Sequence, residues 1–345
     1  MEYSGLLPKY VVNRKLNEQE LALQLKQGQR LSVEPLYQLS VITMNSTFLE
    51  SVDKWFAWKG MLSIMTIAFL AMFGVGIGGA ALDWFLQGIG IVYTDNDPLE
   101  MLLNGGGMLV VVAAVVWVLC WILCKESFAY THYPIRFDRK ARMVHVFRTD
   151  GSTLSVPWEK VFFTLGELKQ WKEWEVRGHV LKEDGVTIKD TFSLSYIGTF
   201  DAAEYVFNPD RVAADDHLRA HWEFIRRFME EGPQAVIGQV QFCMPIADKK
   251  ETIGNGFERV CANIASAPVM VYWMFWPFCM LIGIGRIFAM RTSKIPRFPK
   301  HVQAGSAVEP NDPYAITGNA LGERVPIFPA AAAAAGVRFT GLVRP

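Results

Sequence analysis

Two histidines spaced four residues apart are the first candidates for metal chemistry in this sequence. His217 and His221 lie within Asp215–Glu231, where apolar residues recur at helical spacing, so both imidazoles would fall on one side of a helix, close to Asp215. No cysteine or third histidine is placed to complete a ligand set, and the His-Glu dipeptide of zinc proteases is absent. We therefore expect the two histidines at a solvated helix edge and predict no metal site.

A short acidic stretch offers oxygen ligands for a hard cation. Asp95, Asn96, Asp97 and Glu100 cluster in the sequence, and calcium prefers clustered carboxylate and amide oxygens. The 12-residue pattern of a calcium-binding loop is absent, however, and the same acids fit the simpler role of marking a loop exported across a membrane. We predict no cation site here.

Motifs for covalent or nucleotide chemistry are missing. The sequence contains no Gly-x-Ser-x-Gly, no phosphate-binding Gly-x-x-x-x-Gly-Lys-Ser/Thr and no dinucleotide fingerprint after a strand. The five cysteines are odd in number and scattered, which favours small buried apolar residues over a disulfide framework: Cys120, Cys124, Cys243, Cys261 and Cys279. We predict no catalytic residue, no cofactor and no enzymatic activity. The balance of 34 basic and 34 acidic residues gives no indication of nucleic-acid binding.

Four basic residues are the candidates for contact with a membrane surface. Arg136, Arg139, Lys140 and Arg142 follow closely after a long apolar block. Near an anionic leaflet each such residue contributes on the order of 1 kcal/mol. The sequence leaves two interpretations open: docking of the following domain on the leaflet, or charge that only sets the membrane topology.

The element that precedes these residues is a predicted transmembrane hairpin over residues 60–125. Met61–Leu82 and Met101–Cys124 are uncharged and long enough to cross a bilayer as helices. The loop Asp83–Glu100 is acidic and lacks lysine and arginine, whereas both flanks are basic, so both ends should be cytoplasmic. Small residues cluster at Gly74–Gly79 and at Gly105–Gly107, and Gly76 and Ala80 fit a small-xxx-small spacing. This predicts packing of the two helices against each other and leaves open packing against another copy or a partner. The absence of charge within the spans argues against a transporter.

A third apolar segment lies within residues 260–290. Ala262–Gly285 carries no charge and is long enough to span. Basic residues flank both of its ends, and Pro268 and Pro277 interrupt it, which favours a re-entrant or interface-lying helix instead. Both interpretations remain open.

The soluble parts are predicted to combine strands with a helix. Residues 1–59 are expected to form a cytoplasmic arm, and residues 130–235 a separate domain. Alternation with period two and the turns Asp150-Gly151 and Asp184-Gly185 indicate five or six antiparallel strands, with Trp158 and Trp174 in the core. The amphipathic Asp215–Glu231 should be the helix that covers the sheet. Residues 291–345 are basic at first and then rich in proline and glycine, so the tail is expected to be flexible.

This order of elements resembles the bacterial pleckstrin-homology-like fold over about Tyr133–Glu231, including Leu154–Val161 (LSVPWEKV). In that fold a strongly bent antiparallel sheet is closed by a C-terminal helix, and its members often follow a transmembrane hairpin. The resemblance implies a membrane α-helical hairpin joined to an α+β soluble domain of this type.

A second resemblance covers about Phe48–Tyr314. The segments YPIRFDRK, VPWEKVFF, HVLKEDGVTIKDTFSL and HWEFIRRFMEEGP, with FLESVD before the first span, resemble an uncharacterised proteobacterial membrane-protein family. That family is associated with type VI secretion gene neighbourhoods.

We therefore predict that the chain is a multi-pass inner-membrane protein that acts by binding a partner. The second resemblance implies that it serves as an immunity or accessory factor for a type VI secreted effector. Its partners would be the lipid bilayer and a secreted toxin or secretion component, with no nucleic acid and with the oligomeric state open. The alternative is a membrane- or lipid-sensing module that acts through the pleckstrin-homology-like domain.

Overall fold

The computed structural model describes residues 9–38, 40–168, 173–194, 214–240, 243–262 and 269–318. The chain divides into two compact units. The first contains Met1–Trp58, Tyr130–Met280 and Ile295–Pro345, and the second contains Lys59–Ala129 and Leu281–Lys294. The chain therefore leaves the first unit twice and returns to it twice.

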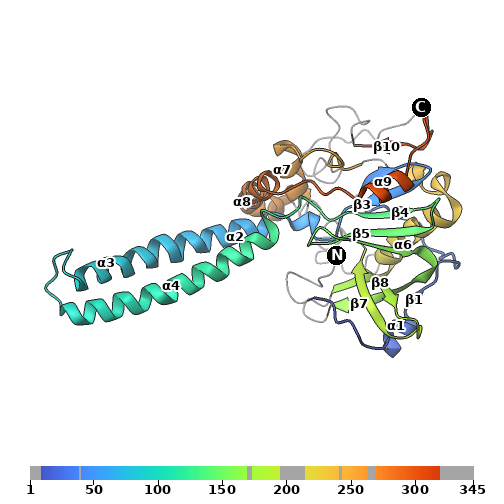
Figure 1. The fold of residues 1–345 in the computed structure, drawn as a ribbon. Coiled ribbons are helices and arrows are strands. Elements are labelled where there is room, and N and C mark those ends of the chain that lie inside the picture. The colour runs from blue at the N-terminus through green and yellow to red at the C-terminus, as the bar shows by residue number, and fades with distance from the viewer. Residues whose placement is uncertain are drawn as a thin grey trace. The chain divides into compact units, whose positions relative to one another are not determined.

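The second unit contains the predicted helical hairpin (Figure 1). One arm is a continuous helical run made of α2 (Met61–Leu70), a π-helical turn η2 (Ala71–Ile77) and α3 (Gly78–Gly88). The other arm is α4 (Pro98–Glu126), which runs antiparallel to it. Both arms are long and apolar enough to cross a membrane, and so is Trp273–Thr292 among the described residues.

Glycines let the two arms approach closely at Gly105, within one of the two expected clusters, but not at Gly76. A Cβ on Gly105 would lie 2.4 Å from the backbone nitrogen of Phe85, and one on Gly88 would lie 2.3 Å from that of Leu102. A Cβ on Gly76 would meet no atom within 4 Å, so the prediction that Gly76 packs the helices together is wrong. The close contact lies nearer the loop, where α3 meets the start of α4.

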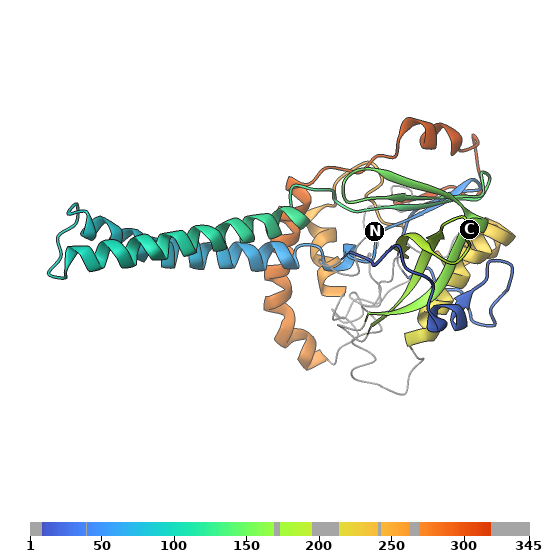
Figure 2. The ribbon, with the colours of Figure 1, turned by 60° about the horizontal axis from the view of Figure 1, so that its bottom comes forward.

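The first unit contains two antiparallel sheets (Figure 2). The six-stranded sheet has the order β10 (Ile316–Thr317), β2 (Val41–Met44), β3 (Phe48–Ser51), β4 (Ile135–Asp138), β5 (Met143–Phe147) and β6 (Thr153–Pro157). The four-stranded sheet has the order β1 (Gln24–Leu25), β7 (Val161–Leu168), β8 (Glu173–Leu181) and β9 (Ile188–Ser193). The soluble part is α+β, and the six strands β4 to β9 confirm the five or six expected from the alternation.

The hairpin is inserted between two neighbouring strands of one sheet. β3 pairs with β4, with Leu49 opposite Phe137 and Ser51 opposite Ile135, although the whole hairpin lies between them in the sequence. β1 and β2 also come from the first 59 residues and pair with β7 and β10. The structure thus differs from the expected division into a separate arm and a domain that begins at residue 130.

The rest of the N-terminal segment lies along the second sheet and the helix α6 (Ala214–Glu231). The amide of Asn13 donates to the carbonyl of Ile188 at 2.8 Å, which places residues 13–16 beside β9. The short helix α1 (Glu18–Ala22) follows and begins with a capping box formed by Asn17 and Glu20. Further on, the amide of Leu36 donates to a carbonyl of α6. The segment is integral to the fold.

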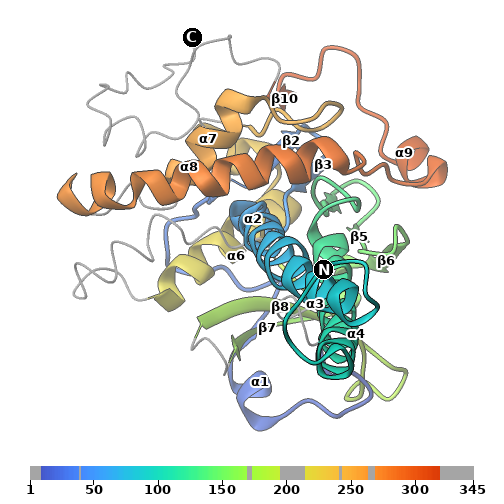
Figure 3. The same cartoon turned by 90° about the vertical axis from the view of Figure 1, so that its left-hand side faces the viewer.

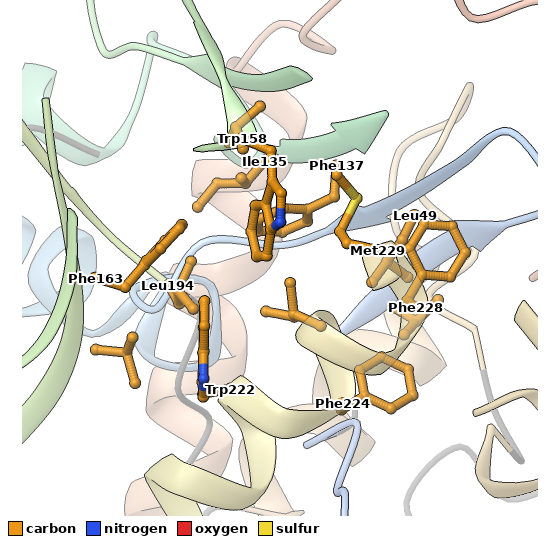
Figure 4. Packing of buried hydrophobic residues seen from close by; sticks show 14 of the residues in the cluster. Leu49, Ile135, Phe137, Trp158, Phe163, Leu194, Trp222, Phe224, Phe228 and Met229 are labelled. Carbon is orange, nitrogen blue, oxygen red and sulfur yellow. The ribbon is translucent and has the colours of Figure 1, made fainter. Parts of the chain in front are cut away.

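One hydrophobic core joins both sheets and α6 (Figure 4). The rings of Trp158 and Trp222 stack with centroids 5.4 Å apart, and Phe163 lies 4.5 Å from Trp222. Trp158 and Trp222 have no solvent-exposed surface, which confirms Trp158 as a core residue. Trp174 is only partly buried at the margin of the core.

The other described helices are the short η1 (Phe56–Trp58), η3 (Trp158–Lys160), η4 (Pro233–Ala235), η5 (Ile237–Gln239), α7 (Ile253–Ala262) and α9 (Lys300–Gly305), and the longer α8 (Val269–Thr292). α8 contributes residues to both units. The segment after it is ordered as far as residue 318, because β10 pairs with β2 and the hydroxyl of Ser306 donates to Asp138 at 2.7 Å. Of the tail predicted over residues 291–345, residues 319–345 lie outside the described residues.

Candidate functional site

Arg136, the first of the four predicted membrane-contact residues, is engaged within the protein. Its Nε and Nη2 donate to one carboxylate oxygen of Glu50 at 3.0 and 2.8 Å. Its guanidinium carbon lies 4.2 and 4.7 Å from the ring centroids of Phe48 and Phe298, so the charged group is held between two aromatic rings. The planar guanidinium is well suited to this combined stacking and pairing.

The other three basic side chains also have partners in the protein. Arg139 donates to the carbonyl of Ser46 at 3.2 Å, and Lys140 pairs with the exposed Glu309. Arg142 contacts Glu159, Glu230 and the carbonyl of Met229 at 2.6, 2.8 and 2.9 Å. The four residues therefore do not form a patch of uncommitted cations, and their role in membrane contact stays a prediction.

Arg142 fastens the C-terminal end of α6 to the turn between β4 and β5. The end of a helix carries a partial negative charge, so a cation there is favourable, and Glu230 and Glu159 raise the pKa of Arg142 in spite of its partial burial. Arg142→Ala is expected to lower the free energy of unfolding by about 1–2 kcal/mol, measured by thermal denaturation. Arg139→Ala removes one backbone contact and should change it by less than about 0.5 kcal/mol. Equal effects of the two variants would contradict this role.

A buried charge centre lies on the face of β8 opposite the core. The carboxylate of Glu175 pairs with Lys54, accepts a hydrogen bond from Nε of Arg177 at 2.7 Å and accepts another from the hydroxyl of Tyr10 at 2.8 Å. The side chains of Glu175 and Lys54 are only 2% and 7% exposed. Burial, followed by the charge of Glu175, raises the pKa of Tyr10 well above its usual value.

A second pairing on the same sheet ties the start of α1 to β8. Glu20 accepts from Nη1 of Arg14 at 2.7 Å, and Nε2 of His179 lies 3.4 Å from its other oxygen. Burial opposes ionisation of Glu20, but the hydrogen bonds from Arg14 and the nearby His179 outweigh it and hold the pKa of this carboxyl far below its usual value. Burial lowers the pKa of His179.

These two groups fix the N-terminal segment on the sheet. Each carboxylate is buried and surrounded by donors from distant parts of the chain, which favours a structural role. Sequence reasoning missed both groups because Tyr10, Arg14, Glu20 and Lys54 lie far from β8 in the sequence. The only signal was the charged row Glu175, Arg177 and His179, which alternates with residues that face the core.

The histidine pair is not at a solvated edge, and that prediction is wrong. His217 is half-buried and His221 is buried, with its Nδ1 3.2 Å from the carbonyl of Leu36. A carbonyl can only accept, so Nδ1 carries the proton and Nε2 is the basic nitrogen. Nε2 has no hydrogen-bond partner among the described residues, and burial lowers the pKa of His221 to about 4.

This environment predicts acid sensitivity. The unfolded chain binds a proton at His221 near pH 6.5, whereas the folded chain binds it only near pH 4, so stability falls as the pH falls between these values. The loss at this site is about 2 kcal/mol between pH 7 and pH 5. His221→Gln keeps a donor for Leu36 and should make the thermal midpoint less dependent on pH in this range. An unchanged slope would contradict the assignment, and His179→Gln provides a comparison at a second buried histidine.

The acidic loop has local structural roles. Asp97 is the N-cap of α4 and accepts from the amide of Leu99 at 3.0 Å, and Asp95 accepts from the hydroxyl of Tyr93 at 2.7 Å. Among the described residues, no three His, Cys, Asp or Glu side chains come together as metal ligands. Cys243, Cys261 and Cys279 are buried, and Cys120 and Cys124 are exposed on α4.

A polar cluster joins the two ends of the hairpin in the second unit. The carboxylate of Glu126, at the end of α4, accepts from the amides of Gly60 and Ser63 at 2.8 and 2.6 Å and from the hydroxyl of Ser63 at 2.6 Å. The side chain of Lys59 donates back to the carbonyl of Glu126 at 2.9 Å. Glu126 thus satisfies free amides at the start of α2, which a glycine cap leaves open.

The second half of α8 crosses this end of the hairpin at a pair of glycines. Gly60 has a φ of +102°, and a Cβ there would lie 2.2 Å from the backbone nitrogen of Arg286. A Cβ on Gly285 would lie 2.2 Å from the carbonyl oxygen of Gly60 and 2.7 Å from Cβ of Ile64. Only glycine permits this approach at both positions.

Gly285→Val is therefore expected to push α8 away from the hairpin and to destabilise the protein by about 1–3 kcal/mol. Thermal unfolding of the full chain in detergent measures the effect. Gly79→Val is the control, because a Cβ at Gly79 meets nothing within 4 Å and should leave the midpoint almost unchanged. Equal midpoints for the two variants would show that the crossing is not tightly packed.

Comparison with known proteins gives one match. No curated protein and no solved structure is significantly similar to this chain. A family model, described as a family of unknown function (DUF6708), matches residues 112–310. The matched range begins in α4, includes β4 to β9, α6 and α8, and covers more than half of the sequence. The chain belongs to this family, DUF6708.

Proposed function

We propose that this protein is an integral inner-membrane protein that acts by binding a partner protein. The hairpin would cross the membrane, with its acidic loop outside and the first unit in the cytoplasm. The length and apolar character of the two arms and the basic residues at both ends support this arrangement.

The observation that carries the proposal is the insertion of the hairpin between β3 and β4. β3 ends at Ser51 and α2 begins at Met61, while α4 ends at Glu126 and β4 begins at Ile135, so only short connections separate the membrane helices from paired strands. A protein bound at the hairpin would thus act on two neighbouring strands of the sheet. A flexible linker would not provide this connection.

The pleckstrin-homology-like assignment is part of the proposal. Its support is that two antiparallel sheets share one core, and that α6, the next described helix after β9, packs on that core. The sheet of this protein also takes strands from before the hairpin, which departs from a domain that simply follows a hairpin.

A protein partner is favoured over lipid headgroups. Arg136 is stacked and paired with Glu50, and Arg142 is bound to three acceptors, so a headgroup would have to compete with interactions already made. For the partner itself, we propose a type VI secreted toxin, against which the protein protects its own cell or which it assists. This step is supported by the family resemblance of the sequence alone.

A competition assay tests the function. The gene is deleted, alone and with its secretion-linked neighbours, and each mutant is grown in contact with the secretion-competent parent. Secretion-dependent killing that a plasmid copy reverses is the result expected for protection, and loss of killing of a sensitive rival is the result expected for an accessory factor. No effect in either direction would overturn the secretion role.

The lipid-sensing alternative has its own outcome. Arg139→Gln with Lys140→Gln removes the two basic groups that have the fewest contacts in the protein. If the alternative is right, this variant reproduces the deletion phenotype while its membrane level stays normal. Under the proposed function it complements as well as the unchanged protein.

A further inference from the structure

The first half of α8 is apolar on all sides and exposed. The side chains concerned are those of Met270, Trp273, Met274, Phe275, Trp276 and Phe278, each at least 39% exposed. No charged residue occurs between Arg259 and Arg286. A helix that is apolar all round is stable only where protein or lipid covers it.

The chain on both sides of α8 belongs to the same folded unit. Before α8, α6 and Cys243 are in the common core. After it, Phe298 packs on Phe147 of β5, and β10 pairs with β2. A bilayer cannot pass through a single folded core, so the chain must begin and end this excursion on one side of the membrane. One uninterrupted helix that crossed the bilayer would end on the other side.

The contacts in the second unit agree with this. Gly285 meets Gly60, Phe288 packs edge-on against Phe128 at 5.9 Å, and the amide of Lys294 donates to the carbonyl of Ala129 at 2.9 Å. Gly285 and Lys294 are roughly 13 Å apart along the helix direction. Their partners nevertheless all lie at the same end of the hairpin.

This part of α8 therefore runs across the end of the hairpin instead of alongside it. Figure 3 looks along the hairpin formed by α2, α3 and α4. A third helix of a transmembrane bundle would contact α2 or α4 at successively deeper positions. Gly285 of α8 meets Gly60, the N-cap of α2, and Ile64 in the first turn of α2.

We propose that α8 is embedded in a single leaflet of the membrane, the one nearest the end of the hairpin where Glu126 binds Gly60 and Ser63. The chain enters and leaves this leaflet on the side of the first unit. The ligand of α8 is the boundary between lipid headgroups and acyl chains, where tryptophan is favoured. The half-helix Val269–Met280 is about 18 Å long, too short for the ~30 Å hydrocarbon layer. This inference rests on the proposal that the hairpin spans the membrane.

Site-directed labelling of the full-length protein in cells tests the topology. Single cysteines are introduced at Asn96 in the hairpin loop, at Asp248 before α8 and at Ala304 after it, all exposed positions. A membrane-impermeant maleimide is added to cells with a permeable outer membrane, and labelling of the unmodified chain gives the background from the native cysteines. We expect labelling of Asn96→Cys in intact cells, and labelling of Asp248→Cys and Ala304→Cys only after the inner membrane is opened.

Two outcomes would overturn the inference. Labelling of Ala304→Cys but not Asp248→Cys in intact cells would make α8 a third span. An unlabelled Asn96→Cys would remove the hairpin as a span, and with it the leaflet that α8 needs. Neither result depends on the competition assay, so a failure of the topology and a failure of the secretion role are distinguishable.

Depth measurement tests the leaflet contact itself. A fluorophore is attached at Met274→Cys in the full chain, reconstituted into vesicles with nitroxide lipids labelled near the headgroup or near the chain end, and Ala304→Cys is the matched aqueous control. We expect at least twofold stronger quenching at position 274 than at 304, and stronger quenching by the shallow nitroxide than by the deep one. Quenching of position 274 by aqueous iodide alone would overturn the proposal.

Discussion

Replacement of Glu175 by glutamine is expected to lower the free energy of unfolding of the first unit by about 3–5 kcal/mol. The isosteric change removes a negative charge that Lys54 and Arg177 share, in a place where water does not replace it. Removal of one partner from a buried ionic group is costly because the remaining charge loses its compensation. Hydrogen exchange of the β8 amides and the thermal midpoint of the full chain measure the loss.

The effect should be strongly asymmetric within the group. Lys54→Met leaves Glu175 with Arg177 and Tyr10 as donors, so it should cost less than half as much as Glu175→Gln. The double variant Lys54→Met with Glu175→Gln should be more stable than Glu175→Gln alone, because one buried cation is gone. Additive losses would show that the two charges are not coupled.

Trp222→Ala is expected to be the most damaging single truncation in the core, at about 3–5 kcal/mol. Trp222 is completely buried and packs its ring against Trp158 and Phe163. Trp158 directly follows β6 of the six-stranded sheet, and Phe163 is in β7 of the four-stranded sheet. Truncation therefore removes contacts between α6 and both sheets. Loss of near-ultraviolet circular dichroism and a lower thermal midpoint are the readouts.

Trp174→Ala is the matched control for size and chemistry. Trp174 is only partly buried at the margin of the same core, so its truncation should cost less than half as much. If the two truncations cost the same, the second sheet is not organised around Trp222. Trp222→Phe should recover part of the loss, since it restores an aromatic ring but leaves a cavity.

The features that could be predicted from the sequence are those that depend on the pattern of apolar, polar and turn residues within a single segment. The hairpin follows from uncharged apolar runs, the strands β4 to β9 from alternation and Asp-Gly turns, and α6 from its apolar face. The pairing of β3 with β4 has no local signature, because the two strands meet across the entire hairpin. The short strands β1 and β2 likewise depend on distant partners, so the first 59 residues were expected to be a separate arm.

The candidate site shows the same limit. Position in the sequence indicated four cations beside a membrane, but the partners of a charge are set by the fold. Glu50, which pairs with Arg136, precedes the hairpin in the sequence, whereas Arg136 follows it. Glu230, which pairs with Arg142, lies in α6. His221 was expected in water because α6 has one apolar face, whereas the segment around Leu36 covers the opposite face. Burial of polar residues by a distant segment is not visible in helical periodicity.

The split sheet has a consequence for biogenesis. β3 leaves the ribosome roughly 80 residues before β4, which at about 5–20 residues per second means about 4–16 s without its neighbour. During that time its edge is an open template for wrong pairing. The sheet can close only after both arms of the hairpin have been made and their ends brought together. If the hairpin spans the membrane as proposed, a chain whose first arm inserted without the second would keep β3 and β4 on opposite sides of the bilayer, so this sheet would close only after insertion was completed.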